Sequence, residues 1–136
     1  MNPQEAAALL GVAASFDNRK PDPDAATAWS VALRDVRFVD ARDAVVAHYS
    51  RTSDWLMPAH VIHGVKAIRR NRLLEHPPIT PPDLEEAETR AWMRAMTQRI
   101  ADGEVIDPEA ARGELKPRNL GELRSLMARP DEDGAA

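Results

Sequence analysis

A run of basic residues near the middle of the chain has the clearest potential for binding chemistry. Its cations, Lys66, Arg69, Arg70 and Arg72, follow spacings of three and four residues that bring side chains together along a helix. Such a cluster can contact nucleic-acid phosphates or pair with an acidic protein surface. It can also be the solvated last turn of a helix, whose dipole favours positive charge. The pattern predicts weak nucleic-acid binding, with the helix terminus as the alternative.

Two histidines lie three residues apart, at His60 and His63, and would share one face of a helix. Together they could hold a metal ion, but metal sites need three or four converging ligands. His48 and Asp54 are the nearest further candidates. We therefore interpret the pair as solvated or hydrogen-bonded histidines, and we expect no metal and no other cofactor.

Motifs for bond-making chemistry are missing from the sequence. It has no P-loop, no Gly-x-Ser-x-Gly and no His-Glu-x-x-His. Because there is no cysteine, thiolate nucleophiles, disulfides and cysteine-ligated zinc are excluded. The acid pairs Asp22 with Asp24 and Asp40 with Asp43 lie where helices should begin, which is a better explanation than acid–base catalysis. The sequence favours a binding protein over an enzyme.

An N-terminal domain of four amphipathic helices, residues 1–76, should position these side chains. The first helix is predicted from Pro3 to Phe16, because Asn2 can cap it and Glu5 has capping-box spacing. The second should begin near Asp22, the third after Asp40, and the fourth at Pro58, fraying near Leu74. Their apolar stripes predict an all-α fold with one modest core. Residues expected to face it include Leu9, Val12, Ala13, Phe16, Ala25, Trp29, Ala32, Leu33, Ala41, Val45, Val61 and Val65.

A proline-rich stretch, His76–Pro82, follows this bundle. Closely spaced prolines favour an extended, semi-rigid spacer. We therefore assign residues 77–82 as a linker, 83–128 as a helix-prone, loosely packed segment, and 129–136 as a disordered tail.

A fifth helix is predicted from Asp83 to Ala101, stopped near Asp102–Gly103, with a further turn at Asp107–Glu109 and a short last helix over Asn119–Met127. The fifth helix has a thin apolar face, so its large side chains either dock on the bundle, pair with another copy of the chain, or bind a partner. Aromatic anchors and methionines are typical of helix-in-groove recognition. The predicted partner-binding residues are Leu84, Trp92, Met93, Met96, Leu120, Leu123 and Leu126.

The composition is that of an ordinary globular chain. Of 136 residues, 29% are charged and 43% apolar. Residues 1–76 hold 10 Lys and Arg against 9 Asp and Glu, whereas residues 77–136 hold 8 against 13. This balance lacks the basic excess of a strong nucleic-acid binder. No apolar run approaches the ~18 residues that span a bilayer, and the start lacks a basic signal region, so we expect a cytoplasmic protein without membrane contact.

Residues 3–73 resemble the N-terminal domain of small phage proteins that load or inhibit the hexameric replicative helicase. The resemblance lies in an opening helix, Glu5–Leu10, then Ala28–Trp29 with Leu33, and then Asp43–Tyr49. The turn Asp54–Val61 follows and leads into the basic helix. These features cover about half of the chain and are mostly core positions. Proteins of this kind are common in actinobacterial phages and prophages.

The resemblance implies a replication accessory protein that binds a DnaB-like helicase, through a flexible C-terminal segment, and delivers it to single-stranded DNA. It implies no catalytic residue. This chain departs from the family in its helix-prone C-terminal half. Two alternatives stay open: a small helix-turn-helix-like DNA-binding regulator using the third and fourth helices, and a phage structural or interaction protein. The late position of the basic residues argues against base reading, which uses the start of a recognition helix.

Overall fold

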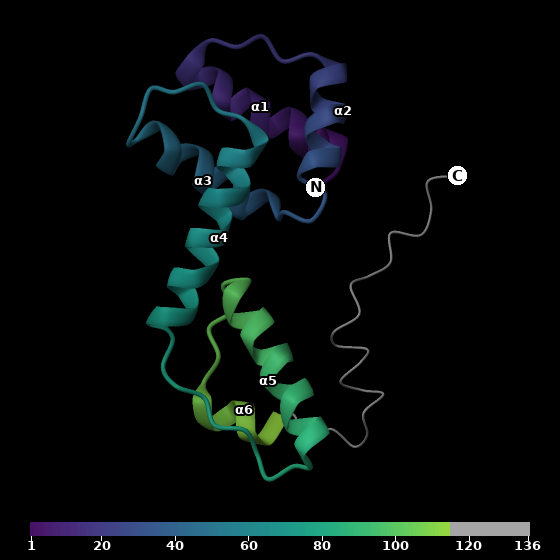
Figure 1. The fold of residues 1–136 in the computed structure, drawn as a ribbon, viewed down its shortest axis with the longest axis vertical. Coiled ribbons are helices and arrows are strands. Elements are labelled where there is room, and N and C mark those ends of the chain that lie inside the picture. Colours follow the sequence, from purple (N-terminus) through teal and green to yellow (C-terminus); the bar gives the residue numbers. More distant parts are fainter. Residues whose placement is uncertain (115–136) are drawn as a thin grey trace, which may run out of the picture. The chain divides into compact units, whose positions relative to one another are not determined.

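The computed structural model describes residues 1–114, and these form an all-α fold with no strand among them (Figure 1). The predicted helix at Asn119–Met127, the leucines Leu120, Leu123 and Leu126, and the tail 129–136 lie outside the described residues. The described helices are α1 (Pro3–Asp17), α2 (Pro23–Ala32), α3 (Phe38–Tyr49), α4 (Pro58–Glu75), α5 (Glu86–Ala101) and α6 (Pro108–Glu114).

The first helix begins and ends with side-chain and backbone caps that its sequence supplies. The Asn2 side chain accepts from the Glu5 backbone N–H at 2.8 Å, and the Glu5 carboxylate accepts from the Asn2 N–H at 2.9 Å. This reciprocal pair confirms the predicted capping box. At the other end Asn18 adopts the left-handed conformation, with φ of 56°, and donates its N–H to Ala14. Asparagine tolerates this conformation better than most residues.

The second helix starts as predicted and the third starts earlier. Asp22 caps α2, accepting from the Ala25 N–H at 2.7 Å. α3 begins at Phe38 with Arg37 as its N-cap, so Asp40 is a buried residue of the first turn and the predicted start after Asp40 is wrong. The reason is that Phe38 packs against the core, which extends the helix backwards.

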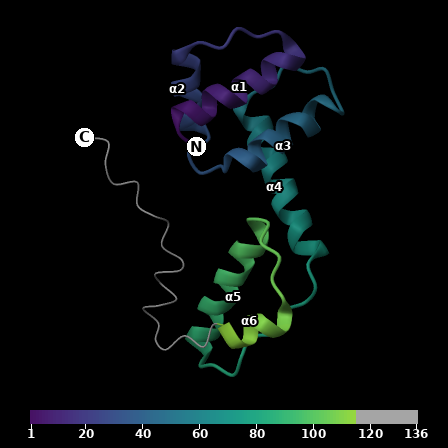
Figure 2. The same ribbon diagram turned by 180° about the vertical axis from the view of Figure 1, so that it is seen from behind.

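The chain divides into two compact units, Met1–Ile68 and the residues from Arg69 on. In unit 1, α1 lies against both α2 and α3, and the two opposite views agree on this (Figures 1 and 2). The first part of α4 crosses α3 closely: a Cβ added to Gly64 would lie 2.8 Å from that of Ala44. The core of unit 1 consists of Leu9, Ala13, Leu33, Ala41, Ala44, Val45, Leu56, Val61 and Val65.

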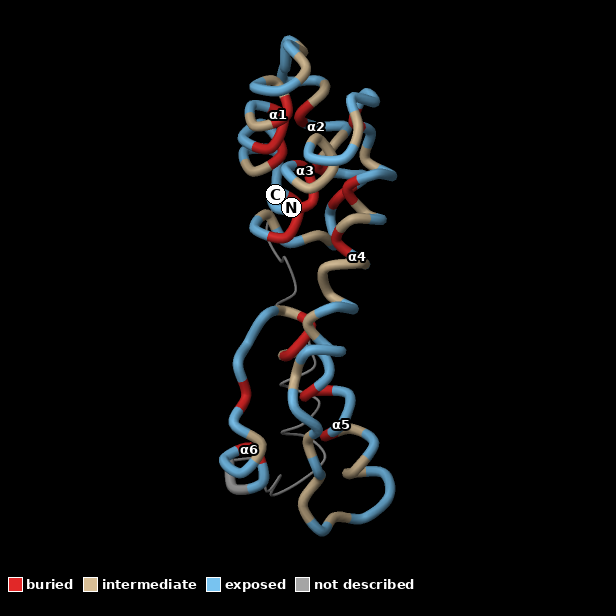
Figure 3. The backbone as a smooth tube through the Cα atoms, turned by 90° about the vertical axis from the view of Figure 1, so that its left-hand side faces the viewer, coloured by how far each residue is buried: buried red, intermediate tan, exposed pale blue. Residues whose placement is uncertain are grey.

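Most of the predicted stripe faces this core, but Ala32 and Phe16 are exposed. Buried and exposed positions alternate along each helix (Figure 3). Ala32 is exposed because α2 turns Ala26 and Ser30 inward instead. Phe16 is half exposed, and Trp29 is only partly buried at the core's edge.

The division between the units falls inside α4, eight residues before the end of the predicted bundle at residue 76. Arg69 and Arg72 explain this position, because both bind the C-terminal end of α5 in unit 2. Arg69 forms an ion pair with Asp102, and Arg72 donates to the backbone oxygen of Ala101 at 2.9 Å. The last turns of α4 are therefore held by bonds to α5 within unit 2.

Unit 2 has a core of its own. Trp92, Ala95, Met96, Ile100, Ile106 and Ala111 pack together, with Ile79 and Leu84 against them. α5 begins at Glu86, with a capping box between Glu85 and Glu88, three residues later than predicted. It ends where predicted: Gly103 has φ of +90°, and the N–H of Glu104 reaches the oxygen of Arg99 at 3.0 Å. This is a Schellman motif, for which glycine is the preferred residue.

This core contains part of the predicted partner-binding set. Trp92 and Met96 are fully buried within unit 2, and Leu84 packs against them half-buried. Loops contribute the apolar partners that the face of α5 lacks, Ile79 before it and Ile106 after it. Helical periodicity alone does not reveal these loop contacts. Of the predicted anchors within the described residues, Met93 stays exposed.

Candidate functional site

The basic cluster is split between structure and solvent. Arg69 and Arg72 bind the end of α5, where positive charge complements the helix dipole. Lys66 and Arg70 are exposed. Arg69 and Arg72 therefore act as cations at a helix terminus, which was the alternative interpretation of the cluster. The terminus that they complement is that of α5 and not that of their own helix. Phosphate contact stays a prediction for Lys66 and Arg70.

The histidines are solvated and hydrogen-bonded, as interpreted from the sequence: the Nδ1 atom of His60 accepts from the Met57 N–H. His60 and His63 are both exposed, and the ring of His60 lies against that of His48 with centroids 4.9 Å apart. His48 binds the backbone oxygen of Asp54 at 2.7 Å. Across residues 1–114, no three side chains of the metal-binding types converge.

An open hollow of about 690 Å³ lies in unit 1, beside the ends of α1 and α3. Two of its walls are aromatic and exposed: Phe16 and Trp55 have 50% and 55% of their surface open to solvent. Phe16 stacks on Tyr49, with centroids 5.0 Å apart and planes 16° apart. We call this surface the aromatic hollow; its lining residues are Phe16, Asp17, Asn18, Tyr49, Arg51, Thr52, Ser53 and Trp55.

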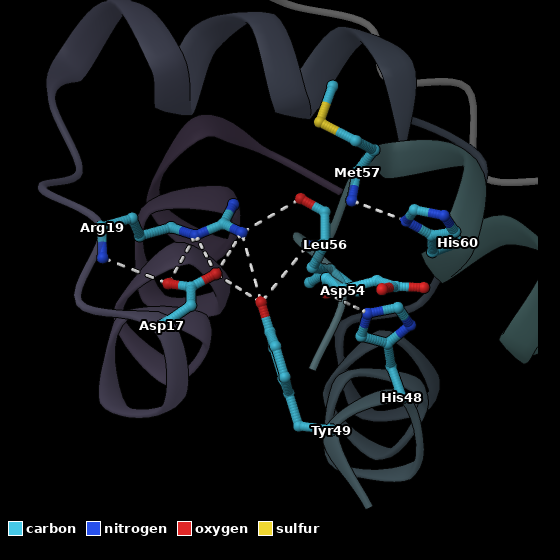
Figure 4. Close-up of polar contacts among 8 residues, drawn as sticks. All are labelled: Asp17, Arg19, His48, Tyr49, Asp54, Leu56, Met57 and His60. Atoms are coloured by element: carbon cyan, nitrogen blue, oxygen red, sulfur yellow. Dashed lines mark hydrogen bonds and ion pairs between the residues drawn. The ribbon is translucent and has the colours of Figure 1, made fainter. Parts of the chain in front are cut away.

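An ion pair between Arg19 and the lining residue Asp17 joins the segments that form the hollow (Figure 4). Arg19 and Asp17 are each only 8% exposed at the side chain, and the Arg19 Nε donates to both Asp17 oxygens, at 3.0 and 2.9 Å. The same guanidinium donates to the Leu56 oxygen at 3.0 Å. It also lies 4.5 Å from the centroid of the Trp55 ring and 5.4 Å from that of Trp29. Arg19 thus ties the loop that carries Trp55 to α1 and α2 by ionic, hydrogen-bonding and cation–π contacts.

Tyr49 completes this network. Its hydroxyl donates to Asp17 and accepts from the Leu56 N–H at 3.3 Å. Hydrogen bonds from Arg19, opposed by burial and assisted by the Tyr49 bond, lower the pKa of Asp17 from 3.8 to about 2. Burial, followed by the bond to Asp17, raises the pKa of Tyr49. Asp17 is therefore ionised and Tyr49 protonated at neutral pH, the states in which these bonds form.

Sequence reasoning missed the aromatic hollow. Phe16 was expected in the core, and Asp17 and Arg19 lie just beyond the predicted end of the first helix at Phe16. The pair could not be recognised from spacing, since its aromatic partners come from loop residue 55 and from α2 and α3. A signal was nevertheless present: Trp55 and Met57 are large apolar residues within a short turn, and both are half exposed.

Comparison of the chain with protein-family models, with curated proteins and with solved structures gave no significant match. None of the helices within residues 1–114 combines the length and apolar character needed to cross a bilayer.

Proposed function

We propose that this chain is a phage-type replication adaptor that binds a hexameric replicative helicase and regulates its loading onto DNA. The aromatic hollow carries the proposal. Exposed aromatic side chains held in one place are the usual anchors of protein interfaces. The resemblance of residues 3–73 to helicase loaders supports the choice of partner. On this proposal the protein acts by binding energy and not by bond chemistry.

The hollow is well suited to an interface because its walls are already ordered. Trp55 is held by Arg19, and the neighbouring Leu56 is fully buried with both of its backbone polar groups bonded. Phe16 is held by stacking on Tyr49. A surface that is ordered before binding loses less conformational entropy when the partner arrives.

The hollow replaces the fifth helix as the leading candidate for the helicase contact. Trp92 and Met96 already fill the core of unit 2, so using them would require that unit to unfold. Met93 is exposed and could supply a secondary contact.

Titration of the cognate helicase with the full chain tests this proposal. Trp55→Ala and Phe16→Ala should each weaken binding by about tenfold or more, as expected for truncated interface anchors. Val31→Ala is the matched control, because Val31 is an exposed apolar residue of α2 that does not line the hollow. Thermal melts would verify that each variant is folded.

Two outcomes would contradict the proposal at different levels. Unchanged binding by Trp55→Ala and Phe16→Ala, together with loss in Met93→Ala, would move the interface to unit 2. No binding by the wild-type chain would remove the helicase as the partner.

A further inference from the structure

His60 performs an unusual capping role at the start of α4. The backbone oxygen of Met57 accepts from the N–H of His60 at 2.9 Å, which places Met57 at the N-cap and His60 three residues on. In return, the Nδ1 atom of His60 accepts from the Met57 N–H at 2.9 Å. Glutamate or glutamine normally makes this return bond in a capping box. An imidazole can make it only while Nδ1 carries no proton.

His48 holds the other side of the same loop. Its Nε2 lies 2.7 Å from the Asp54 backbone oxygen; because a carbonyl can only accept, Nε2 carries the hydrogen. The ring also meets Tyr49 edge-on, with centroids 4.9 Å apart. The segment from Asp54 to Met57, which carries Trp55, is therefore fastened at one end by His48 and at the other by His60 (Figure 4).

The two rings respond to protonation in opposite ways. His48 lies in the last turn of α3, where the helix dipole stabilises a positive charge. His60 lies in the first turn of α4, where the dipole opposes one. Protonation of His48 leaves its Nε2 donor in place. Protonation of His60 at Nδ1 removes the acceptor of the Met57 N–H.

We propose that the His48–His60 pair is a proton-sensitive latch on the loop that forms one wall of the aromatic hollow. With His60 neutral, the Met57 N–H is bonded and the loop is held. With His60 protonated, this bond is lost and the segment bearing Trp55 and Met57 loosens. The other charged or titratable groups around the pair are Asp54 in the loop and Tyr49 on α3, which leads to Asp17 and Arg19.

The latch is tested on the full chain by amide hydrogen exchange between about pH 8 and pH 5, the range in which histidines change charge. Exchange rates are corrected for the intrinsic pH dependence of unprotected amides. Protection of the Met57 N–H in the wild-type chain should fall by about five- to tenfold on acidification, the size expected for loss of one helix cap.

Matched variants identify the histidine responsible. His60→Gln keeps an acceptor of the capping-box type but cannot take up a proton, so Met57 protection should stay high at acidic pH. His63→Gln changes an exposed histidine one turn further along the same helix and should behave like the wild type. A wild-type Met57 protection that does not change with pH, or an unaltered pH response in His60→Gln, would overturn the latch.

The consequence for helicase binding rests on the proposed function, and the latch itself does not. If the hollow binds the helicase, wild-type affinity should fall on acidification and His60→Gln should resist that fall. A pH-dependent Met57 amide without helicase binding would leave the latch standing and reject the partner. Helicase binding through Trp55, together with a Met57 amide whose protection does not change with pH, would support the partner and reject the latch.

Discussion

Arg19 is the residue on which the candidate site most depends, because one guanidinium joins α1, the loop before α4 and two tryptophan rings. Its partner Asp17 has a folded-state pKa of about 2 against an ordinary value of 3.8. A carboxyl with a depressed pKa stabilises the fold above its unfolded value and stops doing so as pH falls through its folded value. The contribution of Asp17 is therefore present at pH 7 and is lost between pH 3.8 and about pH 2.

Asp17→Asn should remove this contribution. We expect a loss of about 2 kcal/mol of unfolding free energy at neutral pH, since a neutral amide cannot balance the buried guanidinium. The difference between wild type and variant should shrink as the pH falls toward 2, because the wild-type carboxylate is then protonated. Urea unfolding at several pH values measures it. A difference that stays constant down to acidic pH would show that Asp17 contributes by packing and not by charge.

The four cations of α4 should separate into two classes. Arg69→Ala and Arg72→Ala should lower the stability of unit 2, because each removes a bond to the end of α5. Lys66→Ala with Arg70→Ala should leave stability unchanged and reduce the salt dependence of any DNA binding by about one unit of slope for each cation. Thermal melts and salt titrations provide the two measurements. If the Arg69 and Arg72 variants and the Lys66 and Arg70 variants changed the melting temperature and the salt dependence equally, the division into two classes would be wrong.

At the scale of elements, the close approach of α3 and α4 depends on positions where side chains are small. Gly64 is such a position, because α4 crosses α3 there and an added Cβ would lie 2.8 Å from the Ala44 Cβ. Alanine is the better helix former, by about 1 kcal/mol. Real Cβ atoms do not approach this closely, so α3 and α4 would have to move apart.

Gly64→Ala should therefore destabilise unit 1 by about 1–3 kcal/mol, the usual cost of overpacking. Gly11→Ala is the matched control within α1, since an added Cβ there has no neighbour within 4 Å. The control should raise stability by about 0.5–1 kcal/mol through helix propensity alone. Chemical denaturation of both variants gives the comparison. Stabilisation by both substitutions would mean that the close crossing of α3 and α4 does not constrain residue 64.

The elements that could be predicted from sequence are those whose signals are local. Asn2 with Glu5, Asp22 before Pro23, Pro58, and Gly103 each mark a helix end through bonds within a few residues, and each is found where predicted. The start of α3 was misplaced because Phe38 is held by distant core residues, which outweigh the local signal of Asp40. The burial of Trp92 was missed for the same reason, since loop residue Ile106 helps to cover it.

The candidate site could not be predicted, because none of its defining contacts is local except the one between Asp17 and Arg19. Tyr49 lies 32 residues from Asp17, and the Leu56 oxygen lies 37 residues from Arg19. A short turn with two large apolar residues, Trp55 and Met57, was visible in the sequence. Its ordering by a buried ion pair depends on the packing of α1 and α3.

At the scale of the whole molecule, the helix α4 belongs to two separately packed units. Its first part completes the core of unit 1 through Val61 and Val65, and its last turns bind the end of α5 through Arg69 and Arg72. The proline-rich stretch follows this helix and is therefore not where the packing of unit 2 begins. Ile79 within that stretch packs against the core of unit 2.

Fragments cut on either side of the last turns of α4 should consequently differ in stability. A fragment of residues 69–136 keeps Arg69 and Arg72, whereas a fragment of residues 77–136 loses both contacts with Asp102 and Ala101. Hydrogen bonds to charged groups contribute about 1.5–3 kcal/mol each, and small domains have little stability to spare. The shorter fragment should therefore lose its cooperative melt or melt at a clearly lower temperature. Trp92 is the only tryptophan in both fragments, so its fluorescence reports directly on this core.

Two further variants make this test specific to the arginines. Arg70→Ala in the longer fragment changes an exposed cation of the same turn and should leave the melt unchanged. Arg69→Ala with Arg72→Ala in that fragment should reproduce the behaviour of the shorter one. In the N-terminal half, fragments 1–68 and 1–76 should melt alike, because residues 69–76 add nothing to the core of unit 1. If fragments 69–136 and 77–136 melted at the same temperature, the end of α4 would be dispensable for unit 2 and the boundary would move back to the proline-rich stretch.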